Sequence, residues 1–301
     1  MSQERRMRVP NKIQWPKKSK LAVTFTVALE LWSEGQTPIP TQVAKVEDAK
    51  IRGAKIREGT VDIHAIDTVE YGGRRGIWRL IELFERNKIV STVTVSGRAA
   101  EKFPEAVAEL HKQGHEIAGH SYAQDVFPFL EFPQYGIKSE LDNIRKSCSI
   151  IESVTGERPV GWFDSGGARS PDTYKLLCDE GFIWCADASD DDIPYLYANS
   201  DGKSMVIIPY QHEINDLSLV LVGKNPPFVY TNCFTDAFDF LYEEGKRGDP
   251  KMLSATIHAH ILARPWGAGA FENCLKYASR FSDIWITTRK EMAQWCLKQA
   301  E

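Results

Sequence analysis

Two histidines and one glutamate of this sequence stand where apolar, strand-like runs end. Glu30, His120 and His258 each come directly after such a run. An imidazole donates or accepts a proton near neutral pH, whereas a buried carboxylate needs a partner. His260 falls on the same face as His258 if the strand continues past it. These residue types predict a polar cleft that contains two histidines and several carboxylates.

Polar residues follow nearly every predicted strand. The predicted strands are 21–29, 89–95, 115–119, 160–163, 182–186, 206–209, 218–222, 253–258 and 284–287. The predicted helices are 76–87, 101–113, 138–156, 171–180, 234–246, 270–281 and 289–300. About seven of these strands alternate with helices, and 206–209 and 218–222 are further predicted strands. The alternation predicts βα units around a parallel sheet or barrel. In such folds the loops after the strands carry the chemistry.

The composition of the 301 residues is that of an ordinary globular protein, and no linker marks a second domain, so we predict one domain over 1–301. The 37 basic and 41 acidic residues give a net charge of −4, which favours neither nucleic acid nor an anionic membrane as partner. The sequence has no run of about 18 apolar residues, and from its polar, basic start we expect no signal peptide. Six cysteines without a CxxC spacing fit a reduced, cytoplasmic protein.

Residues 33–75 interrupt the alternation of strands and helices. The stretch contains Gly35, Pro38 and Pro40 among many charges, and its only predicted helix is a short one at 43–50. It also carries apolar residues that need burial: Ile51, Ile56, Val61, Ile63 and Ile66. Long irregular insertions in compact domains are usually functional. We predict that this one covers the cleft mouth or contacts another subunit, and we favour a homo-oligomer.

The segment 114–121, GHEIAGHS, resembles a motif of the polysaccharide deacetylase superfamily. Other segments resemble the same superfamily in the expected order: 21–30, 159–162, 187–195, His258 and 264–265. The resemblance covers about residues 18–298. It implies an α/β fold, a distorted seven-stranded (β/α) barrel, which agrees with the predicted strands.

Deacetylases of that superfamily share an aspartate pair after the first strand, an H-x-x-x-H pair and a late acid histidine. The aspartate pair corresponds here to Ala28 and Glu30. The histidine pair corresponds to His120 and Gln124, and a neutral amide is a poor zinc ligand. The resemblance leaves Glu30 and His120 as metal ligands, with Asp125 as a substitute. We expect at most a weakly bound divalent metal such as zinc, and weak or absent metal dependence.

Four stretches look like the allantoinase-like branch of the superfamily, whose members hydrolyse cyclic amides, imides and ureides. They are EYGGR at 70–74, DDDIPY at 190–195, EIND at 213–216 and ARPWG at 263–267. Phe163 replaces the arginine that the superfamily usually has after the fourth strand. The resemblance implies a hydrolase of a non-peptide C–N bond in a small cyclic amide, imide or ureide.

Amide hydrolysis needs an activated water, a polarised carbonyl and a proton for the leaving nitrogen. Glu30 and His120 are the candidates for activating water, either directly or through a metal. The resemblance makes His258 the acid, and Asp187 or Asp191 would hold its tautomer.

Several residues are expected to bind or orient a small-molecule substrate. They are Gln124, Asp125, Trp162, Asp187, Asp191 and Arg264. Trp162, Trp266 and Tyr210 offer flat faces that suit a heterocycle. Two alternatives stay open at this point, a metal-dependent deacetylase of an N-acetylated carbohydrate and a non-catalytic relative that binds a metabolite.

Overall fold

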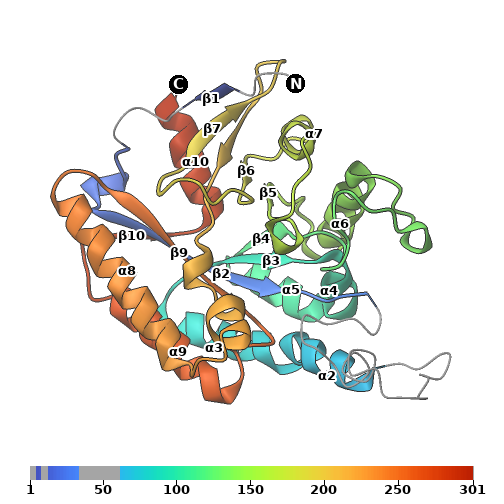
Figure 1. Cartoon of the computed structure of the whole chain (residues 1–301), viewed down its shortest axis with the longest axis horizontal. Coiled ribbons are helices and arrows are strands. Elements are labelled where there is room, and N and C mark those ends of the chain that lie inside the picture. The colour runs from blue at the N-terminus through green and yellow to red at the C-terminus, as the bar shows by residue number, and fades with distance from the viewer. Residues whose placement is uncertain (1–4, 8–12, 34–61, 301) are drawn as a thin grey trace, which may run out of the picture.

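The computed structural model describes residues 5–7, 13–33 and 62–300 and contains a curved, mostly parallel sheet (Figure 1). Its strands are β1 (Arg5–Met7), β2 (Leu21–Leu29), β3 (Thr92–Val95), β4 (Glu116–Gly119), β5 (Gly161–Trp162), β6 (Trp184–Cys185), β7 (Tyr195–Ala198), β8 (Ser204–Ile207), β9 (Lys251–His258) and β10 (Trp285–Thr287). They pair in the order β1-β7-β8-β6-β5-β4-β3-β2-β10, and β9 also pairs with β2. All pairs are parallel except β1–β7 and β7–β8.

Strand β2 is central to the sheet. It pairs with β9 over most of its length, with β10 near its start and with β3 near its end. All nine of its residues are buried, as expected of a continuously apolar parallel strand. A bridge between Asn215 and Thr256 joins the segment after β8 to β9. Seven parallel strands, β8, β6, β5, β4, β3, β2 and β9, thus follow one another around the curve, which confirms the predicted fold type.

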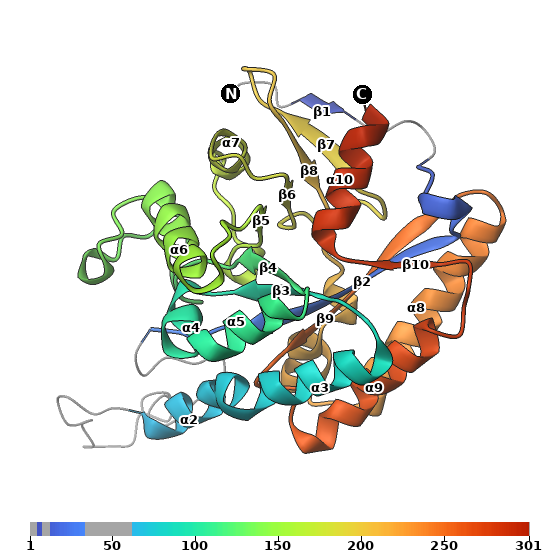
Figure 2. The same cartoon turned by 180° about the vertical axis from the view of Figure 1, so that it is seen from behind.

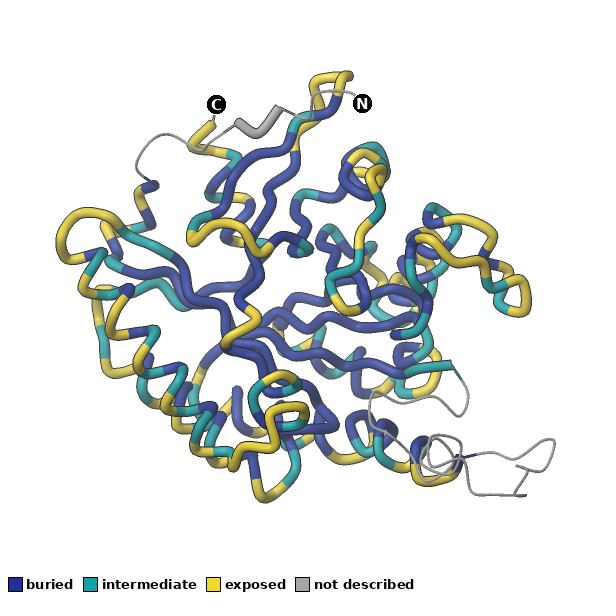
Figure 3. Tube along the Cα trace, in the orientation of Figure 1, coloured by how far each residue is buried: buried dark blue, intermediate teal, exposed yellow. Residues whose placement is uncertain are grey.

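Helices lie outside the curved sheet (Figures 1 and 2). They are α2 (Ile63–Tyr71), α3 (Ile77–Asn87), α4 (Gly97–Lys102), α5 (Pro104–Lys112), α6 (Glu140–Thr155), α7 (Thr173–Asp179), α8 (Phe228–Lys246), α9 (Pro265–Ala278) and α10 (Arg289–Ala300). Helices α3, α8 and α9 pack together, as do α4, α5 and α6. Figure 3 shows buried strands surrounded by helices and loops with exposed residues. None of the described helices is long and apolar enough to cross a membrane.

The end of the predicted insertion is helical, which the sequence pattern did not indicate. Helix α2 continues through a π-helical turn, Gly72–Gly76, into α3. The pattern was weak because α2 buries little more than Ala65 and Val69 and exposes Ile63. Residues 34–61, which include the predicted helix at 43–50, lie outside the described part of the chain.

Glycines in the π-helical turn allow a close approach to the loop that follows β9. A Cβ atom at Gly76 would lie 1.8 Å from the carbonyl oxygen of Ala259. A Cβ atom at Gly72 would lie 3.2 Å from the backbone nitrogen of His260. Any larger residue at Gly76 would therefore collide with this loop. The turn holds the end of α2 and the start of α3 directly against the loop that carries His260.

Two other predicted elements differ from the structure. The run at 218–222 is not a strand but part of a π-helical turn, Leu217–Val222. The side-chain oxygen of Asn215 accepts a hydrogen bond from the backbone nitrogen of Leu217 at 2.7 Å, which starts the turn. The predicted helix at 101–113 is instead the pair α4 and α5, because Pro104 cannot continue a helix and begins a new one.

Candidate active site

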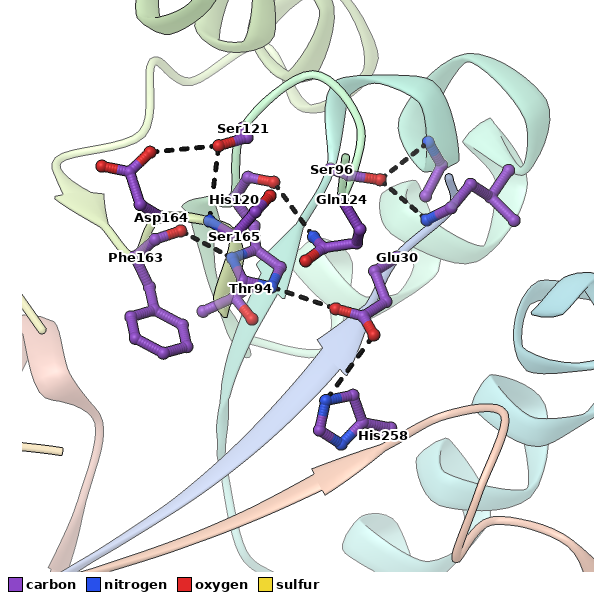
Figure 4. A network of polar contacts seen from close by, with 12 residues as sticks. Glu30, Thr94, Ser96, His120, Ser121, Gln124, Phe163, Asp164, Ser165 and His258 are labelled. Atoms are coloured by element: carbon purple, nitrogen blue, oxygen red, sulfur yellow. Dashed lines mark hydrogen bonds and ion pairs between the residues drawn. The ribbon is translucent and has the colours of Figure 1, made fainter. Parts of the chain in front are cut away.

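Glu30 lies between two histidines that come from different strands (Figure 4). It follows β2, whereas His120 follows β4 and His258 ends β9. The Glu30 Oε2 atom is 3.1 Å from His120 Nε2, and its Oε1 atom is 3.6 Å from His258 Nε2. All three side chains are buried. The parallel strands thus bring the three predicted catalytic residues together at the carboxyl edge of the sheet.

The tautomer of His120 follows from its contact with Phe163. His120 Nδ1 lies 2.6 Å from the Phe163 carbonyl oxygen, which can only accept a hydrogen bond. Nδ1 therefore carries a hydrogen, and Nε2 faces the Glu30 carboxylate. A hydrogen bond between those two atoms needs one further proton. The Phe163 ring also stacks on the imidazole with 5.2 Å between ring centroids and 5° between planes, which fixes its orientation.

Asp216 orients His258. Its Oδ1 atom lies 2.6 Å from His258 Nδ1, and its carboxylate also accepts hydrogen bonds from the backbone nitrogens of His258 and Leu262. Asp216 is fully buried, so these bonds meet no competition from water. The arrangement places the Nδ1 hydrogen toward Asp216 and points Nε2 at Glu30.

The structure gives Asp187 and Asp191 other partners than the expected His258. Asp187 accepts a hydrogen bond from the backbone nitrogen of Asp164 at 2.8 Å and contacts the Cys185 thiol at 3.1 Å. Asp191 is exposed and accepts bonds from the backbone of its own turn. Sequence reasoning missed the role of Asp216, although it ends the EIND segment. That motif was the one signal that could have found it.

The charges of the site follow from burial and mutual contact. Burial raises the pKa of Glu30, but the charge of His258 and the hydrogen bond with His120 outweigh burial and lower the pKa to about 2. Burial lowers the pKa of His258, but Glu30 and Asp216 raise it to about 9. At neutral pH the site therefore contains a glutamate anion beside a histidinium. Burial keeps His260 neutral by lowering its pKa to about 4.

Glu30, His120 and His258 line a cavity of about 210 Å³. Its apolar walls are formed by Trp32, Phe127, Phe163 and Tyr210. Phe163 and Tyr210 stack on each other at 4.8 Å, so His120, Phe163 and Tyr210 form one continuous aromatic wall. No lysine or arginine is among the described residues that line the cavity. The cavity thus combines flat apolar walls with one histidinium–carboxylate pair.

The remaining predicted binding residues are distributed over the cavity and its surroundings. Gln124 and Tyr210 line the cavity, and the Gln124 amide donates to the His120 carbonyl at 3.4 Å. Asp125 does not line the cavity but accepts a bond from the backbone nitrogen of Ser33 at 2.8 Å. Trp162 is completely buried in the core, and the next residue, Phe163, faces the cavity instead.

Arg264 fastens the loop after β9 rather than lining the cavity. Its guanidinium donates to the carbonyl oxygens of His260 and Thr68 and lies 4.1 Å from the centroid of the Tyr71 ring. Trp266, predicted as a wall, is 54% exposed on α9 and outside the cavity. The ARPWG motif therefore connects α2 to the site loop.

The donor set at Glu30 is one ligand short of a catalytic zinc site. Glu30 Oε2 and His120 Nε2 converge, but the position four residues after His120 is the amide of Gln124. Within the described residues, no group of three or more histidine, cysteine, aspartate or glutamate side chains is arranged to hold a metal ion. Catalytic zinc normally has three protein ligands. These residues do not fit such a site, and a weakly held ion at Glu30 and His120 stays a prediction.

A larger cavity of about 310 Å³ lies at the amino ends of β4 and β5. Its buried acid, Glu116, accepts hydrogen bonds from Thr92 and Trp184. Its buried histidine, His115, contacts the backbone and hydroxyl of Ser91. Because these groups are engaged in the fold, the Glu30 cavity is the candidate site.

Comparison with known proteins relates this site to one family. Residues 60–182 match the family model described as polysaccharide deacetylase. A Schizosaccharomyces pombe protein assigned to the polysaccharide deacetylases is 29% identical over 94% of this chain and 92% of its own length. The chain is thus similar to polysaccharide deacetylases, over residues 60–182 to the family model and over most of its length to this relative. It is accordingly an enzyme, a hydrolase that acts on carbon–nitrogen bonds other than peptide bonds.

Two further similar proteins show how broad the relationship is. The solved structure of Puue allantoinase is 29% identical to this chain, covers 95% of this chain and 93% of its own, and superposes with a TM-score of 0.79. The peptidoglycan deacetylase of Helicobacter pylori is 26% identical over 76% of this chain and 86% of its own length. This chain is thus similar to proteins with different named substrates.

Proposed function

We propose that this enzyme hydrolyses the C–N bond of a small cyclic amide, imide or ureide. The observation that carries the proposal is the Glu30 carboxylate between the Nε2 atoms of His120 and His258, inside a small cavity with aromatic walls. Flat rings suit such walls, and the two histidines supply the base and the acid that amide hydrolysis needs. The similarity to Puue allantoinase supports the same substrate class.

The tautomers assign a proton path for this reaction. In this path the Nε2 atom of His120 takes a proton from water while the water oxygen bonds to the carbonyl carbon. The C–N bond then breaks, and the His258 imidazolium gives its Nε2 proton to the leaving nitrogen. Glu30 stabilises the new charge on His120 and lies between both Nε2 atoms. It can therefore return the proton from His120 to His258, which restores the starting state.

A deacetylase of N-acetylated carbohydrates is the second candidate, because the Helicobacter pylori relative carries that name. Polysaccharide deacetylases share an aspartate pair and a histidine pair. In this chain Ala28 replaces one of the aspartates and Gln124 replaces one of the histidines. The alternative also needs room for a sugar, whereas four aromatic side chains narrow the cavity here. These two observations favour the cyclic substrate.

Turnover of a defined panel separates the two candidates. We expect the purified protein to open succinimide, hydantoin or dihydrouracil and to leave N-acetylglucosamine oligomers unchanged, with and without added zinc. The Glu30→Gln variant, which keeps the size of the side chain but removes its charge, should lose ring-opening activity. Release of acetate from the oligomers without opening of any ring would overturn the proposal in favour of the deacetylase.

A further inference from the structure

Two phenylalanines lead from the wall of the cavity to the protein surface. Phe127 lines the cavity and is partly buried, whereas Phe129 is 69% exposed. Their rings stack with 5.7 Å between centroids and 5° between planes. Leu130, the next residue, is also exposed at 42%. An apolar surface thus continues outward from the cavity beside Phe127.

A contiguous apolar surface marks a ligand or partner site more often than a single exposed side chain does. Here the exposed Phe129 ring is continuous with the cavity through Phe127. A group that leaves the cavity along this wall would be covered on one side by an aromatic face. The position of this apolar surface therefore indicates the chemistry of a substituent on the bound ring.

The charges of the cavity restrict that substituent further. The Glu30 carboxylate lies in the cavity, and Asp216 lies behind His258. Within the described lining, no lysine or arginine is present to pair with a carboxylate or phosphate on the ligand. The His258 cation is already paired with Glu30 and Asp216. An anionic substituent held against the aromatic wall would therefore lose hydration without gaining a free counterion.

We propose that the substrate is an uncharged ring that carries an apolar substituent, and that this substituent binds against Phe127 and Phe129. The inference rests on the proposed function for the identity of the ring. The subsite itself is defined by the aromatic pair and by the absence of lysine and arginine from the described lining.

Three compounds test the subsite: succinimide, phenylsuccinimide and a succinimide that carries a carboxymethyl group. Their affinities are measured by calorimetry with a His258→Ala protein, so that turnover does not interfere. We expect phenylsuccinimide to bind about tenfold more tightly than succinimide, and the carboxymethyl compound more weakly than both. When Phe129→Ala is added to this protein, the ratio of its affinities for phenylsuccinimide and succinimide should fall to about one.

Phe240 provides the matched control, because it is a phenylalanine on α8 with 67% exposure and does not line the cavity. Adding Phe240→Ala should leave the preference for the phenyl compound as it was. Equal affinities for the three compounds, or a preference that Phe129→Ala does not change, would overturn the subsite. Turnover of the same compounds is measured separately with the wild-type protein. If phenylsuccinimide binds more tightly than succinimide but no ring is opened, the proposed reaction is overturned and the subsite is supported. Absence of binding by all three compounds would overturn both.

Discussion

Glu30 is the residue through which the two histidines of the site act on each other. Each histidine has its Nδ1 atom occupied by an acceptor, the Phe163 carbonyl for His120 and Asp216 for His258. Both Nε2 atoms consequently face the same carboxylate. We therefore expect the three residues to act as one acid–base unit, in which changing any member affects proton transfer more than binding.

Replacing His258 with alanine tests the acid. Loss of a general acid usually lowers the rate by about 10²–10⁴-fold, so we expect kcat of His258→Ala to fall in that range on a confirmed substrate. His64→Ala is the matched control, because His64 is exposed on α2 and away from the cavity. Circular dichroism should show an intact fold in both variants. A near-normal kcat in His258→Ala would remove His258 from the mechanism, and His260 would be the next residue to test.

The pH dependence of kcat/KM should report the protonation of His258. Its pKa is raised to about 9, so the acid is present at neutral pH and is lost as pH rises through about 9. Asp216→Asn removes one of the two carboxylates that raise this pKa, and the alkaline limb should move toward neutral pH. His260, with a pKa lowered to about 4, cannot produce this limb. An alkaline limb at the same pH in wild type and Asp216→Asn would contradict the assignment.

The raised pKa of His258 also makes the free energy of unfolding depend on pH. Because the folded-state pKa of His258 lies above its usual 6.5, the contribution is fully present below pH 6.5. It is lost as pH rises through about 9. The difference in Tm between wild type and His258→Ala should therefore shrink over this interval.

Gln124 determines whether the site can hold a metal. With Glu30 and His120 as the two strong donors, chelation should leave activity largely intact, and elemental analysis should find less than one metal per chain. Gln124→His supplies the missing imidazole and should increase zinc content, which shows that the measurement can detect a gain. One tightly held metal per wild-type chain, together with loss of activity on chelation, would contradict this prediction.

At the scale of elements, the π-helical turn between α2 and α3 fixes the loop after β9. Gly76→Ala should lower the free energy of unfolding by about 1–3 kcal/mol, because its Cβ atom would collide with the Ala259 carbonyl. Gly269→Ala is the matched control, since nothing lies within 4 Å of its Cβ position in α9. That change should stabilise by about 0.5–1 kcal/mol. Urea denaturation of both variants measures the difference, and equal midpoints would refute the role of the turn.

The strands could be predicted from the sequence more fully than the contacts between loops. The runs that became β2 and β9 are apolar because both faces are covered, and their ends located Glu30 and His258. Asp216 could not be assigned to His258, since the two lie 42 residues apart and meet only through the curve of the sheet. For the two-residue strand β5, alternation was too short to show that Phe163 rather than Trp162 faces the cavity.

At the scale of the whole molecule, exposed apolar residues favour association of several copies. Ile63 on α2, Trp78 on α3 and Trp266 on α9 are 61%, 38% and 54% exposed. Large apolar side chains on the surface mark contacts with a partner where they form one contiguous patch. We predict a homo-oligomer, to which the segment at 33–75 contributes or in which it covers the cavity.

Light scattering coupled to size exclusion tests this association. The wild-type protein should elute with the mass of more than one chain, and Trp266→Glu should shift it toward the monomer. Phe240→Glu changes an exposed residue of α8 that is not among the three named here, and it should leave the mass unchanged. A monomeric wild-type protein at micromolar concentration would refute the prediction.

The position of β2 has a consequence for how the chain folds. Its neighbours β9 and β10 come from the last fifth of the sequence, and Arg289 at the start of α10 donates hydrogen bonds to Thr26 in β2 and Ser254 in β9. Strand β2 is made early, but most of one of its edges stays unpaired until β9, near the end of the chain, has been made. Such late closure slows folding and prolongs exposure of an apolar strand. Since Glu30 directly follows β2 and His258 ends β9, the two residues can come together only when synthesis is almost complete.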